Sequence, residues 1–233
     1  MLNMEHQKKA EESKLERYSA EKIKQLLKLY FIMGSNNSKL SPEEVLIQAL
    51  KGGITIFQYR EKGEDALSGK EKMELGKRLQ QLCKEFGVPF IVNDDIDLAL
   101  ELDADGVHIG QDDETAEAVR AKIGAKILGV SAHSLEEVEL AVRAGADYIG
   151  IGPIYHTNTK KDAKEVRGTA LITDVRRQGV IIPIVGIGGI TAANAAPVFH
   201  AGGDGVAVIS EISGADQPFA NTQSLLYAIN KEA

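Results

Sequence analysis

The feature that most constrains the fold is a short sequence pattern that recurs along the chain. It occurs in LKGGITIFQYR, ELDADGVHIG, RAGADYIGIG and HAGGDGVAVIS. Each segment contains the end of a predicted helix, then Gly or Asp residues suited to a tight turn, then a short β-branched or apolar run. Four such joints predict a repeated unit in which a helix leads through a turn into a buried strand.

Further apolar runs predict additional strands. They are LYFIM, PFIVND, KILGVS and PIVGIG, each followed by a stretch with helical spacing such as SPEEVLIQALK or SLEEVELAVRA. About eight strands alternating with about eight helices predict parallel strands covered on both faces, and therefore a single (β/α)8 TIM barrel of the α/β class.

A doubly wound open sheet is the main alternative to the barrel. It favours a G-x-G-x-x-G turn after the first strand, where this chain has GSNNSKLSPEE. The glycine clusters GIGGI and AGGDG come late instead, at the predicted seventh and eighth strands. Barrels commonly bind phosphate after those two strands, so the late position favours the closed barrel.

The start of the chain differs in composition from the rest. We expect an N-terminal helical or frayed extension at residues 1–28 and the barrel catalytic domain at residues 29–233. The opening segment mixes both charges without an apolar run, so we expect no secretory signal, no membrane span and a cytoplasmic location. Removal of about the first 20 residues should leave folding intact, because this polar segment offers little apolar area for burial.

Charge and rare residues narrow the functional classes. A net charge of -7 and a pI near 5.4 argue against a nucleic-acid partner, although a local basic pocket for an anion is compatible with them. Cys83, the single cysteine, lies in a helical apolar pattern and is expected in the core. His108 and His133 have no partner at metal-ligand spacing, which argues against a zinc site.

Polar residues occur where several predicted strands end. In ITIFQYREK, strand alternation places Gln58 and Arg60 on one face and Tyr59 on the other. The carboxyl ends of barrel strands converge on one mouth, so residues distant in sequence can share one pocket. The other polar residues at predicted strand ends are Asn93, Asp94, Asp95, Asp112, Asp113, Ser131, His133, Thr157, Thr159, Lys160 and Lys161.

Each of these residues also has a simple structural explanation. Asp94 or Asp95 can cap the helix of DIDLALEL, Asp112 the helix of DETAEAVRAKI, and Ser134 the helix of SLEEVELAVRA. Together, however, carboxylates at two strand ends, cations at two others and a glycine-rich pair favour a Mg²⁺ ion held between carboxylates and substrate phosphates. The set predicts one diphosphate site and one monophosphate site, and hence group transfer with departure of diphosphate.

Five segments of the chain resemble the thiamine-phosphate synthase family. They are QYREK at 58–62, VNDD at 92–95, HIGQDD at 108–113, GPIYHTNTKK at 152–161 and GIGGI at 186–190. They come in the family's order, from about Leu29 to the C-terminus. The resemblance implies that 4-amino-2-methyl-5-hydroxymethylpyrimidine diphosphate is joined to 4-methyl-5-hydroxyethylthiazole phosphate, which yields thiamine phosphate and pyrophosphate in thiamine biosynthesis.

The resemblance also implies roles for individual residues. The pyrimidine diphosphate would be bound by Gln58, Tyr59, Arg60, Glu61, Lys62, Asn93, Ser131 and Lys160, of which Arg60, Lys62, Ser131 and Lys160 would take part in catalysis. The thiazole phosphate would contact Thr157, Thr159, Gly189, Ile209 and Ser210. Asp94 and Asp113 would ligate Mg²⁺.

Two other functions remain open for this fold. One is the related thiazole tautomerase, against which the set of Lys62, Asp94, Asp113 and Lys160 argues. The other is a non-catalytic ligand-binding regulator that kept the barrel. The expected partners are small-molecule substrates, and a homo-oligomer is compatible with the sequence. We assign no role to His156, which lies between motif residues.

Overall fold

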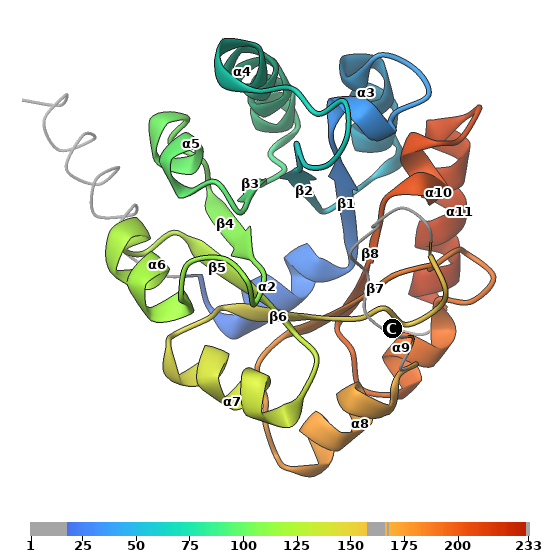
Figure 1. The fold of residues 1–233 in the computed structure, drawn as a ribbon. Helices are drawn as coiled ribbons and strands as arrows, with labels where there is room; N and C mark the ends of the chain where they lie inside the picture. Colours follow the sequence, from blue (N-terminus) through green and yellow to red (C-terminus); the bar gives the residue numbers. More distant parts are fainter. Residues whose placement is uncertain (1–17, 158–165, 167, 232–233) are drawn as a thin grey trace, which may run out of the picture.

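The structure, a computed structural model, describes residues 18–157, 166 and 168–231. Its centre is a closed barrel of eight parallel strands arranged in sequence order, with the helices on the outside (Figure 1). The strands are β1 (Leu29–Met33), β2 (Ile56–Tyr59), β3 (Phe90–Asn93), β4 (Gly106–Ile109), β5 (Ile127–Ala132), β6 (Tyr148–Ile151), β7 (Ile184–Ile187) and β8 (Gly205–Val208). The predicted (β/α)8 barrel is confirmed, and the barrel closes because β1 pairs with both β2 and β8.

Most of the helices cover the outer face of the barrel, whereas α2 lies at one end of it. They are α2 (Ala20–Leu27), α3 (Pro42–Gly52), α4 (Gly69–Phe86), α5 (Ile96–Glu101), α6 (Ala116–Ile123), α7 (Leu135–Arg143), α8 (Ala170–Arg177), α9 (Ala196–His200), α10 (Ser210–Ser213) and α11 (Pro218–Asn230), with a 3₁₀ turn η1 (Ser35–Asn37) after β1. None of the helices in the described part of the chain is long and apolar enough to cross a membrane.

Side-chain caps explain where several helices begin. Asp95 accepts a hydrogen bond from the backbone N–H of Leu98 and caps α5, and Ser134 caps α7 in the same way, as predicted. The prediction that Asp112 caps the next helix is wrong. Thr115 is the N-cap of α6, which leaves Asp112 in the loop before it.

Two apolar layers lie on opposite sides of the barrel wall. Phe57 and Tyr59 on β2 pack outward into the layer between strands and helices, whereas Ile56 and Gln58 point into the barrel. The alternation predicted for β2 is thereby confirmed. Cys83 is buried on α4 in the outer layer, as expected.

Helix α2 closes the amino-terminal end of the barrel. Its buried residues Ile23, Leu26 and Leu27 join the interior cluster that contains Tyr30 and Tyr148. The predicted domain boundary after residue 28 therefore assigns α2 to the extension, although α2 supplies part of the interior core of the barrel. Residues 1–17 lie outside the described part of the chain.

The recurrent αβ joint has a common hydrogen bond at its centre. The side chain of the residue just before each even-numbered strand accepts a hydrogen bond from the first or second backbone N–H of the preceding strand. Thr55 bonds Leu29, Asp105 bonds Phe90, Asp147 bonds Leu128 and Asp204 bonds Ile184, at 2.8 to 2.9 Å. The sequence pattern is thus a structural repeat of two strands and two helices.

Candidate active site

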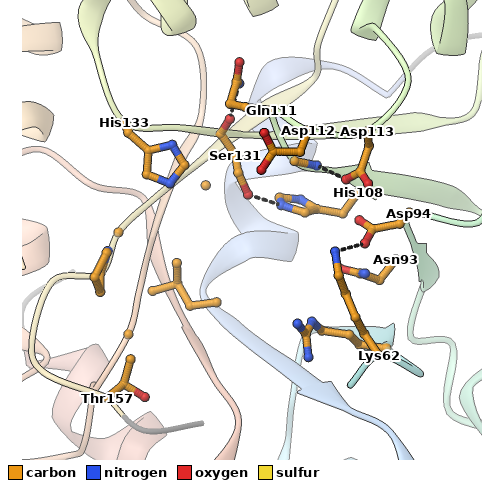
Figure 2. A pocket seen from close by; sticks show the side chains of 17 residues that line it. Lys62, Asn93, Asp94, His108, Gln111, Asp112, Asp113, Ser131, His133 and Thr157 are labelled. Atoms are coloured by element: carbon orange, nitrogen blue, oxygen red, sulfur yellow. Dashed lines mark hydrogen bonds and ion pairs between the residues drawn. The ribbon is translucent and has the colours of Figure 1, made fainter. Parts of the chain in front are cut away.

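A polar cavity opens at the carboxyl-terminal ends of the strands. Many of its lining residues follow β2 to β6, so the cavity collects side chains that are far apart in sequence (Figure 2). It is lined by Arg60, Lys62, Asn93, Asp94, His108, Gly110, Gln111, Asp112, Asp113, Ser131, His133, Gly150, Gly152, Pro153, Thr157, Ile187 and Gly188. Seven of these positions are among the predicted site residues: Arg60, Lys62, Asn93, Asp94, Asp113, Ser131 and Thr157.

One cation and two carboxylates meet on one side of this cavity. Lys62 Nζ lies 2.6 Å from Asp94 Oδ2, and Asp113 lies within hydrogen-bonding reach of Asp94. Figure 2 shows the three side chains together, opposite Thr157 and His133. Asp113 is held in place by the backbone N–H of Gly110, which donates to its Oδ2 at 2.7 Å.

The charges of this group are not balanced. Burial raises the pKa of the Asp94 carboxyl, the neighbouring Asp113 adds to the rise, and the Lys62 ammonium offsets only part of it. Burial by itself would lower the pKa of Lys62, but the bond to Asp94 raises it above its usual value. Two carboxylates therefore share one ammonium group, and a further cation would relieve their repulsion.

The carboxylate pair fits a divalent cation that is only partly coordinated by protein. In the described residues no group of three or more His, Cys, Asp and Glu side chains is placed to hold a metal ion. A cation bound by Asp94 and Asp113 would need the rest of its oxygen ligands from water or from a ligand, which is a common arrangement for Mg²⁺. Asp94 has a φ of 61°, a left-handed conformation that Asp tolerates better than most residues.

A second, smaller cavity adjoins the first. The two share Thr157, Ile187 and Gly188. The second cavity is lined in addition by residues at the ends of β7 and β8 or just after them: Gly189, Ile190, Thr191, Ala207, Val208, Ile209, Ser210 and Glu211. The glycine-rich end of β7 and the end of β8 therefore meet at one cavity, whose use as a phosphate site stays a prediction.

Gly189 occupies a place where a side chain would not fit. Its φ is 62°, and a Cβ built there would lie 2.5 Å from the carbonyl oxygen of His156 and 2.9 Å from Cβ of Tyr155. Both the backbone conformation and the close approach of the loop after β6 require glycine. The loop and the β7 turn thus pack directly on each other beside the second cavity.

Three predicted binding residues lie outside both cavities. Tyr59 points into the helix layer, where its hydroxyl donates to the carbonyl of Lys72, so its side chain faces away from both cavities and its part in substrate binding stays a prediction. Gln58 is buried inside the barrel and bonds Tyr30 rather than lining the cavity. Glu61 accepts hydrogen bonds from Ser35 and from the N–H of Leu67, and so it holds the loops around β2.

Two further predicted residues, Thr159 and Lys160, lie outside the described residues. The remaining ones, Gly189, Ile209 and Ser210, line the second cavity. Burial keeps the Arg60 side chain almost fully out of water, yet it lines the first cavity, which places its charge where an anion can reach it.

The structure adds residues to which the sequence assigned no role at the site. His133 lines the cavity and its Nδ1 lies 3.2 Å from Oε2 of Glu137, a carboxylate on α7. Gln111 donates to the carbonyl of Ser131 at 2.6 Å, and His108 reaches Ser131 Oγ at 2.9 Å. The spacing of four between His133 and Glu137 was the available signal, because a carboxylate in the first turn of α7 can reach back past the N-cap Ser134 to His133.

Comparisons with known proteins show the family of this chain. Residues 29–212 match the family model described as thiamine monophosphate synthase, which is most of the chain. The chain belongs to the thiamine monophosphate synthase family. It is 58% identical to a thiamine-phosphate synthase of Bacillus mycoides over 92% of this chain and 98% of the relative. It is 59% identical to one of Bacillus velezensis over 88% and 91%.

A solved structure agrees with this membership. The thiamine phosphate pyrophosphorylase of Pyrococcus furiosus superposes with a TM-score of 0.80 and 37% identity, over 90% of this chain and 98% of that one. The described residues that line the two cavities all fall within the region matched by the thiamine monophosphate synthase family model. The family resemblance inferred from sequence motifs is confirmed.

Proposed function

We propose that this chain is a transferase that joins 4-amino-2-methyl-5-hydroxymethylpyrimidine diphosphate to 4-methyl-5-hydroxyethylthiazole phosphate and releases pyrophosphate. The observation that carries the proposal is the pair of adjoining cavities. One is polar and charged, the other glycine-rich, and they share Thr157, Ile187 and Gly188. Two ligands bound in adjoining compartments can react where the compartments meet.

The charged cavity suits the pyrimidine diphosphate. Arg60 and Lys62 bring positive charge to it, while Asn93 and Ser131 supply neutral hydrogen-bonding groups. Lys160, which lies outside the described residues, would add a cation from the loop after β6. These groups would bind the diphosphate oxygens and stabilise the charge that develops on them as the diphosphate departs.

Asp94 and Asp113 would hold Mg²⁺ against the diphosphate. Support comes from their adjacent carboxylates, whose negative charge Lys62 neutralises only in part. When bound, the ion would supply additional positive charge to the leaving pyrophosphate. The residual carboxylate charge would then be satisfied without a further protein cation.

The second cavity suits the thiazole phosphate. Gly189, Ile209 and Ser210 would offer backbone N–H groups and a hydroxyl to a phosphate, and Thr157 would contribute its hydroxyl from the shared wall. Thr159, outside the described residues, would assist from the same loop. The glycine backbone would allow the close approach that a phosphate needs.

The proposed reaction needs no nucleophile from the protein. The bond between the pyrimidine methylene carbon and the diphosphate oxygen breaks, and its electron pair leaves with pyrophosphate. The resulting methyl cation, stabilised by the 4-amino group of the ring, is captured by the lone pair of the thiazole nitrogen. The chain's residues orient both substrates and stabilise the departing charge, which accounts for catalysis by positioning and electrostatics.

The two alternatives are less well supported. A thiazole tautomerase has no diphosphate leaving group, so the arrangement of Lys62, Asp94 and Asp113 would have no evident use in it. A non-catalytic regulator would not require paired carboxylates beside a cation. A cytoplasmic location and a homo-oligomeric state stay predictions.

The test is turnover by the purified protein with both substrates and Mg²⁺. Pyrophosphate should appear in step with thiamine phosphate, and a chelator should stop both. Asp94→Ala and Asp113→Ala should each slow the reaction by at least about a hundredfold, roughly 2.7 kcal/mol of barrier. Asp97→Ala, an exposed carboxylate on α5, is the matched control and should keep full activity.

Two results would overturn these proposals. Full activity in the presence of chelator, or in both aspartate variants once circular dichroism shows them folded, would defeat the metal site. Absence of product from the unaltered protein with authentic substrates would defeat the synthase assignment and favour a binding module.

A further inference from the structure

A continuous chain of hydrogen bonds runs through the barrel interior to the cavity. Gln58 Nε2 donates to the hydroxyl of Tyr30 at 2.8 Å, and that hydroxyl lies 2.8 Å from the hydroxyl of Tyr148. The Tyr148 hydroxyl is 2.9 Å from His108 Nδ1, and His108 Nε2 is 2.9 Å from Ser131 Oγ. Five side chains from β1, β2, β4, β5 and β6 are therefore linked in series, and Figure 2 shows the last link.

A glycine makes the central link possible. Gly129 on β5 is in register with His108 on β4 and with Tyr148 on β6. A Cβ at Gly129 would lie 2.3 Å from the Tyr148 hydroxyl and 2.5 Å from His108 Nδ1. Only a residue without a side chain leaves room for the two rings to meet across the intervening strand.

Both tyrosines in this series of hydrogen bonds, Tyr30 and Tyr148, keep their phenolic protons. Burial raises the pKa of Tyr30 and of Tyr148 well above the usual value for tyrosine, and each is almost completely shielded from solvent. Each hydroxyl therefore has one hydrogen to donate, and each has two neighbours in the chain. The direction of one bond then fixes the direction of the next.

The direction is set at Gln58. The amide nitrogen can only donate, so Tyr30 accepts from it and directs its own hydrogen to Tyr148. Tyr148, having accepted, directs its hydrogen to Nδ1 of His108. A neutral imidazole that accepts at Nδ1 carries its proton on Nε2, which donates to Ser131.

We propose that Gln58, Tyr30 and Tyr148 are positioning residues that fix His108 as the neutral Nε2–H tautomer and so make Ser131 a hydrogen-bond donor to the cavity. Because Ser131 Oγ accepts from His108, its own hydrogen is directed to a ligand oxygen. Ser131 lines the cavity assigned to the diphosphate, so this inference rests on the proposed function. The bond would strengthen as negative charge builds on the leaving group.

A role in directing the hydrogen bonds accounts for the buried position of Gln58, which direct contact with substrate does not. Gln58 is 1% exposed and does not line either cavity. If Gln58 were held only by packing, replacing its amide would not change the direction of the hydrogen bonds that follow it. The two roles differ in what happens when the donor is replaced by an acceptor of the same shape.

The first measurement is the tautomer of His108 in the ligand-free protein. Histidine-labelled protein would be examined by long-range ¹H–¹⁵N correlation, with the His108 signals assigned by their loss in His108→Gln. We expect the proton on Nε2. A proton on Nδ1, or a doubly protonated ring near neutral pH, would overturn the inference.

The second measurement reverses the direction of the first hydrogen bond in the series, between residue 58 and Tyr30. In Gln58→Glu an ionised carboxylate accepts from Tyr30, so every bond turns round and the His108 proton moves to Nδ1. Burial raises the pKa of a glutamate, so the spectrum would be recorded at about pH 8.5. Retention of the Nε2–H tautomer in this variant at that pH would show that residue 58 does not set the direction.

The third measurement is kinetic. Tyr148→Phe removes the donor to His108 Nδ1, and kcat should fall by about tenfold or more while KM for the thiazole phosphate changes little. Thr222→Val, which removes a buried hydroxyl on α11 bonded to Pro218, controls for a general loss of stability and should keep its kcat and the His108 spectrum. An unchanged kcat in Tyr148→Phe would overturn the role in catalysis.

These measurements separate the inference from the proposed function. The tautomer is read without substrate, so it tests the hydrogen-bond chain even if the unaltered protein makes no thiamine phosphate. Failure of that protein to turn over would reject the synthase assignment alone. An unaltered protein that is active with His108 in the other tautomer would reject the inference alone.

Discussion

Arg120 on α6 and Asp147, the residue before β6, form an ion pair beside the amino-terminal ends of β5 and β6. Arg120 Nη2 lies 2.6 Å from Asp147 Oδ2, and the same oxygen accepts a hydrogen bond from the N–H of Leu128. The guanidinium also donates to the carbonyls of three loop residues: Gly124, Lys126 and Gly145. Arg176 and Asp204 repeat the arrangement between β7 and β8.

Loss of Asp147 should destabilise the barrel strongly. In Asp147→Ala the mostly buried Arg120 loses its counter-charge and Leu128 loses its acceptor, which should cost about 2–4 kcal/mol of unfolding free energy. Urea unfolding followed by circular dichroism gives the value. Asp216→Ala breaks an exposed ion pair with Lys39 and should leave the unfolding midpoint nearly unchanged. Equal midpoints for the two variants would contradict the structural role of the pair.

Asp105 occupies the equivalent place before β4, and its environment differs. It accepts from the N–H of Phe90, but burial raises the pKa of its carboxyl, and the attraction of Lys126 does not cancel this rise. A raised folded-state pKa means that the carboxyl favours the fold while protonated, and that this contribution is lost as pH rises through the folded pKa.

Asp105→Asn should therefore be more stable than the unaltered protein at neutral pH. The amide oxygen can still accept from Phe90, and no charge is buried. The difference in unfolding free energy should shrink as pH falls toward the usual aspartate pKa of about 3.9, where the carboxyl is protonated anyway. Unfolding curves from pH 7 down to that range test the sign, and a variant that is less stable at pH 7 would refute it.

Helix α2 should be essential to the fold, whereas the residues before it should not be. Leu27→Ala empties a fully buried position against the barrel interior and should cost about 2–5 kcal/mol. Deletion of residues 1–17 removes a polar, mixed-charge segment and should leave thermal unfolding and activity unchanged. A large loss in the truncated chain would show that the segment packs on the barrel or on a second subunit.

Local sequence patterns predicted the barrel because the pattern repeats. The acceptor before each even strand recurs at Thr55, Asp105, Asp147 and Asp204, so the αβ joint could be recognised four times. Hydrophobic runs and capping residues added the remaining elements. The amino-terminal helix was underestimated because Ile23, Leu26 and Leu27 lie among many charged residues, and short amphipathic helices gain their stability from tertiary packing.

The candidate site was predictable only in part. Alternation on β2 already separates Tyr59 from Arg60, and the structure confirms that the two side chains lie on opposite faces, with only Arg60 at the cavity. Depth along a strand is not encoded in alternation, so Gln58 could not be distinguished from a cavity residue. The contact between His108 and Tyr148 depends on strand register across Gly129, which no local pattern specifies.

Gly189 provides a test of the second cavity. Gly189→Ala would place a Cβ in a left-handed backbone conformation, 2.5 Å from the carbonyl of His156, so the β7 turn must move away from the loop after β6. We expect the Kd for the thiazole phosphate to rise by about tenfold, or 1.4 kcal/mol, and that for the pyrimidine diphosphate to change much less. Gly87→Ala has a φ of 66° with open space around the Cβ, so it carries the same backbone strain far from the site. Separate calorimetric titrations of both ligands would decide, and equal losses for the two ligands would assign Gly189 to general packing.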